Sequence, residues 1–169
     1  MEARLLIEFK QHSVFRLKEG QRMIHLAMEK AKEEQLWLMP GKIGTPLGNQ
    51  ILHICGNMTQ YAIASLTDTK DQRQRNSEFS TKGGFTKNEL LQKLDHTVAQ
   101  AIAAIENAPI EAFLNNRKVQ GFEFSGVGVV LHAVEHFSYH VGQIAFWVKQ
   151  LNQLDLGFYA HHDLTQLNE

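Results

Sequence analysis

Apolar residues recur at three- and four-residue steps along four long stretches of the chain. Residues at this spacing share one face of a helix, so the pattern is typical of amphipathic helices. We therefore expect four helices, over residues 4–32, 47–66, 86–107 and 125–151. Two of the expected starts carry capping signals. Thr86 and Glu89 have the spacing of a capping box, and Ser125 can cap the last helix.

The chain between these helices is punctuated or polar. Two prolines and three glycines separate the first two helices within residues 36–48. Residues 109–128 read as an irregular connection with a short extended piece near 119–124. No run of residues predicts a convincing strand. Four long helices in a chain of this length predict an all-α protein, a four-helix bundle formed as one domain from residues 1–169.

Residues 68–85 form the most polar stretch of the sequence, and their composition predicts a solvated loop. The stretch is longer than an ordinary connection in a helical bundle. A loop that covers a substrate site is therefore the alternative interpretation.

Charge and cysteine content exclude several classes of protein. The chain has 17 basic and 18 acidic residues, a net charge of −1, which gives no reason to expect a nucleic-acid or membrane-surface partner. No long uncharged apolar run predicts a membrane span. The single cysteine, Cys55, cannot form an intrachain disulfide and fits a reducing cytoplasm.

Histidine is the unusual component, with nine residues, and three of them follow one another at four-residue steps in the last helix. His136 and His140 lie one turn apart on one face, the arrangement of helical metal-binding pairs. His132 is in line with them, but three such residues span about 12 Å and cannot all reach one ion. The third ligand must come from another helix, and His53, inside the second helix among apolar residues, is the candidate. His132 is then expected at the site mouth or in a hydrogen bond.

Three protein ligands leave one coordination position open on a catalytic zinc-type ion. That position can lower the pKa of a bound water toward neutrality or hold a thiolate. Imidazole ligands are compatible with zinc, nickel and iron(II). Asn57 and Gln143 each lie about one turn from an expected ligand. They are candidates for contacts to the ligand rings or the substrate, and the alternative is that they are packed or solvated amides.

Four stretches of the sequence resemble the DinB/YfiT-like superfamily of metalloenzymes, and within it a small bacterial branch of unknown function. They run through nearly the whole chain in the same order: Leu47–Tyr61 with its Leu-His-x-x-Gly-Asn, Arg73–Phe79, His132–Ile144 with its His-x-x-x-His before Gly-Gln, and Asp155–Tyr159. The set is specific, although each motif alone is weak.

The resemblance implies a bundle with an up-down-down-up course, a divalent ion held by His53, His136 and His140, and a homodimer. Relatives include transferases and isomerases that use low-molecular-weight thiols such as bacillithiol or mycothiol, which implies a small-molecule substrate and a thiol cofactor. Arg73, Arg75 and Glu78 lie where that branch carries charged residues near the metal mouth. Arginine suits recognition of a carboxylate or phosphate, and the alternative is a solvated loop.

Two classes of function fit these features. The first is a metal-dependent enzyme that activates water or a small thiol, in the manner of a hydrolase or a thiol-dependent transferase. The second is a non-catalytic, dimer-forming protein in which the ion holds two helices together. An accessible fourth position favours the enzyme, and a side chain such as His132 or Glu135 closing that position favours the structural protein. A third, weaker alternative is a hydrogen-bonded histidine network without metal.

Overall fold

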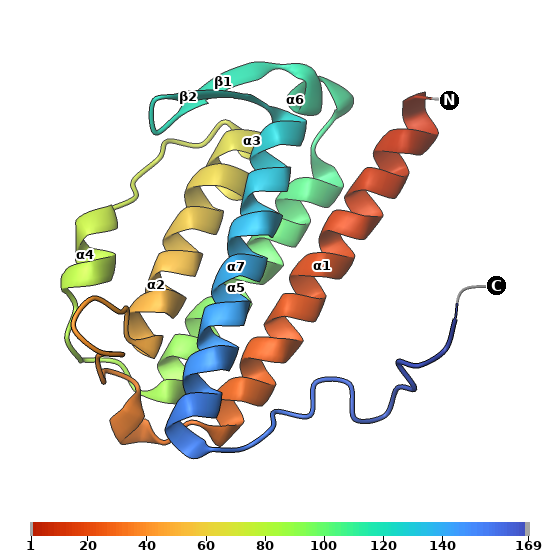
Figure 1. Cartoon of the computed structure of the whole chain (residues 1–169). Helices are drawn as coiled ribbons and strands as arrows, with labels where there is room; N and C mark the ends of the chain where they lie inside the picture. The colour runs from red at the N-terminus through yellow and green to blue at the C-terminus, as the bar shows by residue number, and fades with distance from the viewer. Residues whose placement is uncertain (1, 168–169) are drawn as a thin grey trace.

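Four long helices lie side by side in the computed structural model, which describes residues 2–167 (Figure 1). They are α1 (Glu2–Lys30), α2 (Leu47–Met58), α5 (Lys87–Asn107) and α7 (Gly126–Asn152). The shorter elements are η1 (Glu33–Gln35), η2 (Thr59–Ala64), α3 (Ser65–Thr67), α4 (Arg75–Ser80), α6 (Ile110–Leu114), β1 (Asn116–Val119) and β2 (Phe122–Ser125). The long helices begin and end within two residues of the predicted bounds, except that the second predicted helix is divided among α2, η2 and α3.

Both predicted capping signals are confirmed. The hydroxyl of Thr86 accepts a hydrogen bond from the backbone N–H of Glu89, whose carboxylate accepts one from the backbone N–H of Thr86 at 2.8 Å. The Ser125 hydroxyl accepts a hydrogen bond from the N–H of Gly128 at 3.2 Å. These bonds satisfy N–H groups in the first turns of α5 and α7 that have no partner within the helix.

The second predicted helix is helical but not uniform. It begins as α2 at Leu47, widens into the π-helical turn η2 at Thr59 and closes with α3. π-Helical turns within a helix are rare and frequently lie at functional sites. This one carries Tyr61, whose side chain is fully buried between the helices.

The structure is mostly helical, as predicted, but the expectation that no segment forms a strand is wrong for residues 116–125, where only a short extended piece near 119–124 was expected. Strands β1 and β2 pair there as an antiparallel hairpin, with Val119 opposite Phe122. Gln120 and Gly121 connect the strands with φ angles of 53° and 85°. Positive φ at both central residues is the requirement of a type I′ turn, which glycine meets without steric cost. The strands are four residues each and the turn is not the usual Asn-Gly, so the sequence signal was weak.

The core is a continuous apolar interior to which all four long helices contribute. Helix α1 contacts α5 and α7, and α2 contacts the same two helices. Fully buried positions include Leu17, Ile24, Ile51, Leu94 and Ile144. Within residues 2–167, no helix is both long and apolar enough to cross a bilayer.

Candidate metal centre

Helices α2 and α7 face each other across an interior that is polar where the rest of the bundle is apolar. Helix α2 presents polar side chains at steps of three and four, and α7 presents histidines at steps of four. The facing pairs are Gln50 Oε1 with His140 Nδ1 at 3.4 Å, His53 Nε2 with His136 Nε2 at 3.0 Å, and Asn57 Nδ2 with His132 Nε2 at 3.2 Å. We call these six residues the polar ladder. Each member has a partner, as buried polar groups require.

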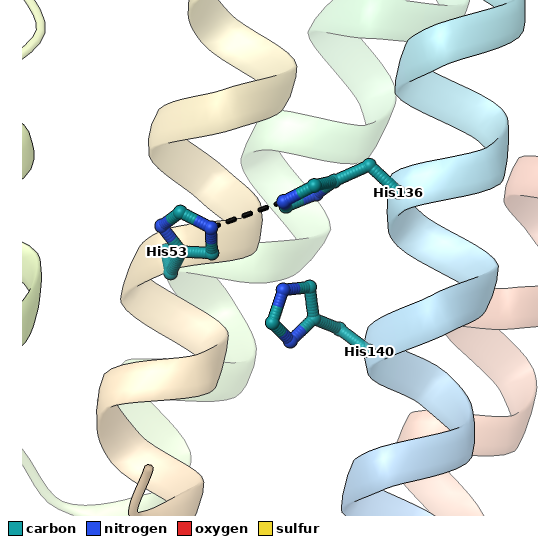
Figure 2. Close-up of side chains that lie close together, drawn as sticks. All are labelled: His53, His136 and His140. Carbon is teal, nitrogen blue, oxygen red and sulfur yellow. Dashed lines mark hydrogen bonds between the residues drawn. The ribbon is translucent and has the colours of Figure 1, made fainter.

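The middle of the polar ladder brings three imidazoles to one point. His53 reaches from α2, and His136 and His140 reach from successive turns of α7 (Figure 2). One ring nitrogen from each lies within 4.8 Å of the other two, and among residues 2–167 no other group of three acidic, cysteine or histidine ligands converges in this way. Two imidazole nitrogens on a tetrahedral zinc ion are about 3.3 Å apart at ordinary bond lengths. The three residues can therefore hold a metal ion.

Burial keeps these imidazoles neutral. His53 and His140 are 7% and 8% exposed, and His136 is half-buried. Burial, with smaller contributions from neighbouring side chains, lowers the pKa of His136 to about 3 and that of His140 to about 4. Burial also lowers the pKa of His53, against an opposing hydrogen bond from Glu78. Neutral imidazole is the form that binds a metal, so the site is prepared for an ion at neutral pH.

The second nitrogen of two of these rings has an acceptor that selects the tautomer. His53 Nδ1 lies 2.8 Å from Glu78 Oε2, and His140 Nδ1 lies 3.4 Å from Gln50 Oε1. The Gln50 amide is itself oriented, because its nitrogen donates to the carbonyl of Thr45 at 3.0 Å. A proton on each Nδ1 places the lone pair on each Nε2, the atom that faces the other histidines. An acceptor behind the ring is the usual support of metal-binding histidines.

Glu78 is a buried carboxylate held by Arg73. The guanidinium donates from Nε to Oε1 at 2.7 Å and from Nη2 to Oε2 at 2.8 Å. Burial would raise the pKa of Glu78, but hydrogen bonds from Arg73 and His53 outweigh burial and lower it, so the group is an anion. Arg73 Nη2 also lies 3.2 Å from His53 Nδ1. An ionised carboxylate can only accept, so its shorter contact with Nδ1 requires the proton on Nδ1, and Arg73 Nη2 then donates to Glu78 rather than to the ring.

The interpretation of residues 68–85 as a solvated loop is wrong for Arg73 and Glu78. The Arg73 side chain is 3% exposed, and its remaining donor Nη1 bonds Gln60 Oε1 at 2.9 Å. Arg73 therefore supports Glu78 and does not present a free cation to a substrate. Arg75 is exposed and lies 4.8 Å over the ring of Phe79, which is 4.7 Å from the His53 ring. Arg75 is thus the arginine at the edge of the site.

His132 is near the three histidines but is engaged elsewhere. Its ring stacks on Tyr61 with centroids 3.8 Å apart, and its centroid is 5.7 Å from that of His136. Its Nε2 faces the amide nitrogen of buried Asn57, so that lone pair already accepts a hydrogen bond. Gln143 is half-buried, and its hydrogen bond to His140 opposes the lowering of that pKa.

Sequence reasoning missed the contacts that Gln50 and Glu78 make with the ligand rings. Gln50 had a usable signal, because it precedes His53 by one turn of the same helix. The resemblance places Glu78 near the metal mouth, but nothing in a polar stretch of sequence fixes which histidine such a residue contacts. His12, His96, His161 and His162 are exposed, and Cys55 is buried.

Two solved structures share this fold. A DinB-like protein, YjoA, from Bacillus subtilis matches with a TM-score of 0.67 and 16% identity over 88% of this chain and 96% of that chain. A mutant of the mycothiol-dependent maleylpyruvate isomerase matches with a TM-score of 0.66 and 12% identity over 80% of this chain and 60% of that chain. These identities show the fold alone.

The sequence matches no curated protein. A family model described as protein of unknown function (DUF1572) matches residues 6–159, which is nearly the whole chain. The likeness to DinB-like structures agrees with the resemblance seen in the sequence motifs. The chain therefore belongs to the DUF1572 family, and its fold is similar to that of DinB-like structures.

Proposed function

We propose that this protein is a divalent-metal-dependent enzyme in which His53, His136 and His140 hold the ion and leave one position open. The observation that carries the proposal is the convergence of three neutral imidazoles, one of which, His136, is less buried than the other two. Zinc, nickel and iron(II) all suit an imidazole donor set. The partial exposure of His136 supports access of a small molecule to the open side.

The ion, when bound, supplies a Lewis acid that lowers the pKa of a water or low-molecular-weight thiol and so provides a nucleophile. The residues of the chain bind and orient. Arg75 at the edge of the site suits a carboxylate or phosphate on the thiol or on the electrophile. Asn57 and His132 bond to each other beside the ligands and suit a supporting role, whereas Gln143 suits a polar contact to the same molecule. The mycothiol dependence of a structural neighbour supports the thiol.

The proposal extends to the organisation of the protein. Residues 1–169 form one domain with an up-down-down-up course, which the pairing of α2 with α7 in opposite directions and the helix order in Figure 1 support. The protein acts in the cytoplasm, as its single cysteine supports, and forms the homodimer that the superfamily resemblance implies.

A spectroscopic titration tests the open position. Cobalt(II) bound to the purified protein gives visible absorption bands, and addition of cysteine as the thiol probe is expected to add a sulfur-to-cobalt charge-transfer band. His161→Ala, at an exposed histidine, is expected to behave as the wild type. Cobalt bands that cysteine leaves unchanged would contradict a thiol-accepting position and favour a non-catalytic ion that holds α2 to α7.

A further inference from the structure

We propose that Glu78 and Arg73 are positioning residues for the metal ion, and that Gly56 is the residue that makes their contact with His53 sterically feasible. This inference rests on the proposed function, because it concerns the same ion. Neither Arg73 nor Glu78 is expected to touch the ion or a substrate. Their role is to fix the ring and the tautomer of His53 and to increase its basicity as a ligand.

The contact between Glu78 and His53 fixes the orientation of the His53 ring. Glu78 Oε2 lies 2.8 Å from His53 Nδ1, and the two side chains are 9% and 8% exposed. With Nδ1 fixed in this bond, Nε2 on the opposite side of the ring points toward His136 (Figure 2). A carboxylate acceptor also draws the Nδ1 proton and raises the basicity of the ring as a ligand.

Arg73 stabilises the charge of the buried Glu78 carboxylate, because it bonds both of its oxygens. A fork of two hydrogen bonds fixes both oxygens of Glu78 in one plane. Arg73 is held in turn by Asp71, whose Oδ1 accepts from the Arg73 backbone N–H at 2.9 Å, and by Gln60. Gln60 donates to Asp71 Oδ2 at 2.6 Å, which closes the network. The orientation of Glu78 is therefore set by at least three residues behind it.

Gly56 leaves the space on α2 that the Glu78 and Arg73 side chains occupy. It follows His53 by three residues, so it lies on the same side of α2 as the imidazole. A Cβ placed on Gly56 would be 1.9 Å from Glu78 Oε1, 2.7 Å from its Cδ and 3.1 Å from Arg73 Nε. Any other residue would push the pair away from α2. Buried Asn49, also in α2, holds the backbone of this segment against the helix. Its amide donates to the carbonyls of Glu78 and Thr81, each at 2.8 Å.

The two acceptors that support ligand rings differ in strength. His140 has a neutral amide at 3.4 Å, whereas His53 has an anion at 2.8 Å. Charge-assisted bonds are shorter and roughly twice as strong as neutral ones. Removal of the Glu78 carboxylate should therefore weaken binding of the ion more than removal of the Gln50 amide.

Cobalt(II) affinity, measured by competition with a chromophoric chelator, tests the inference. Glu78→Gln keeps the shape but removes the charge, and we expect it to weaken cobalt binding by about 10- to 100-fold and to shift the visible cobalt bands. Gly56→Ala should also lower the affinity for cobalt, although this change removes no charge. The matched controls are Glu29→Gln, on the exposed side of α1, and Gly142→Ala, where an added Cβ meets no atom within 4 Å. Both are expected to bind cobalt as the wild type does.

The Arg73→Lys variant distinguishes the effect of the two parallel hydrogen bonds from the effect of the positive charge. Lysine keeps the positive charge but cannot bond both carboxylate oxygens in one plane, so affinity is expected to fall between the wild type and Glu78→Gln. Circular dichroism shows whether each variant is folded. Wild-type affinity and unchanged cobalt bands in folded Glu78→Gln or Gly56→Ala would overturn the inference while leaving the proposed function intact. Absence of cobalt binding by the wild-type protein would overturn both.

Discussion

Residues 68–85, between α3 and α5, contain an ion pair, and Asp155, in residues 153–167 after α7, forms another with Lys149 of α7. The two pairs are opposite in character. In the first segment Arg73 and Glu78 have side chains 3% and 9% exposed and a contact of 2.7 Å. At the second, Asp155 and Lys149 are 85% and 47% exposed and 3.8 Å apart. The more polar of the two segments is the one that contains a buried ion pair.

The two ion pairs differ in burial because the two segments pack against different groups of the bundle. The first segment packs against α2, where Gly56 leaves room for a carboxylate and His53 supplies a donor without another acceptor. In the second segment, Asp155 and Asp163 are exposed, and the side chain that is buried there is the apolar one of Leu156. A polar composition therefore predicts exposure only where no buried group needs a charged partner.

The largest expected effect on stability comes from Arg73→Ala. This change leaves Glu78 buried without its fork, and removal of one partner from a buried ion pair costs about 3–5 kcal/mol in the free energy of unfolding. Lys149→Ala, in the exposed pair, should leave stability unchanged, because solvent screens that contact. Urea denaturation of both variants provides the measurement. Equal, small effects of the two changes would remove the distinction between the segments.

Acid should destabilise the metal-free protein through the buried histidines. The pKa of His136 falls from 6.5 to about 3 on folding and that of His140 to about 4. Between these values the unfolded chain binds more protons than the folded one, so stability is complete above about pH 6.5 and decreases as the pH falls toward 4 and below. Melting temperatures of the apoprotein across this range test the sign.

A variant without one of these histidines sharpens the pH test. His136→Asn should show a shallower loss of stability between pH 6.5 and pH 4, whereas His161→Asn, at an exposed position, should match the wild type. An identical pH dependence in wild type and His136→Asn would contradict the assignment of the effect to this site.

A smaller effect is expected from Asn49→Ala. The change leaves the carbonyls of Glu78 and Thr81 without their donor, and a lost bond to a buried group costs about 1–3 kcal/mol. The loss should be local, with faster amide hydrogen exchange in α4 than in α5. Uniform acceleration across both helices would show that the contact supports the whole bundle rather than this segment.

The smallest effect is expected from His132→Asn. The His132 ring is stacked on Tyr61 and its Nε2 accepts from Asn57, so the ion should keep its three ligands. Metal content is expected to stay at about one equivalent per chain. Loss of the ion in this variant would make His132 a ligand and would close the position proposed for a thiol or water.

Much of the fold follows from local sequence signals. The periodicity of apolar residues and the caps at Thr86 and Ser125 place the long helices to within two residues. The convergence of His53 with His136 and His140 was expected from the four-residue step in one helix and an isolated polar residue in another, and the structure brings the three together. These features depend on residues near one another or on one helix face.

The features that sequence could not provide depend on long-range contacts of polar groups. Arg73 and Glu78 are separated from His53 by 20 and 25 residues, and no periodicity connects a loop to a helix. The hairpin at residues 116–125 lacked a strong turn signal, and the π-helical turn at Thr59 has none that composition reveals. Tertiary contacts decided all three.

The most direct test of the metal centre is elemental analysis of the purified protein beside His136→Ala and His161→Ala. About one zinc, nickel or iron ion per chain is expected in the wild type and in His161→Ala, and nearly none in His136→Ala. Absence of metal from the wild type after incubation with each divalent ion, or full metal content in His136→Ala, would contradict a site built from His53, His136 and His140.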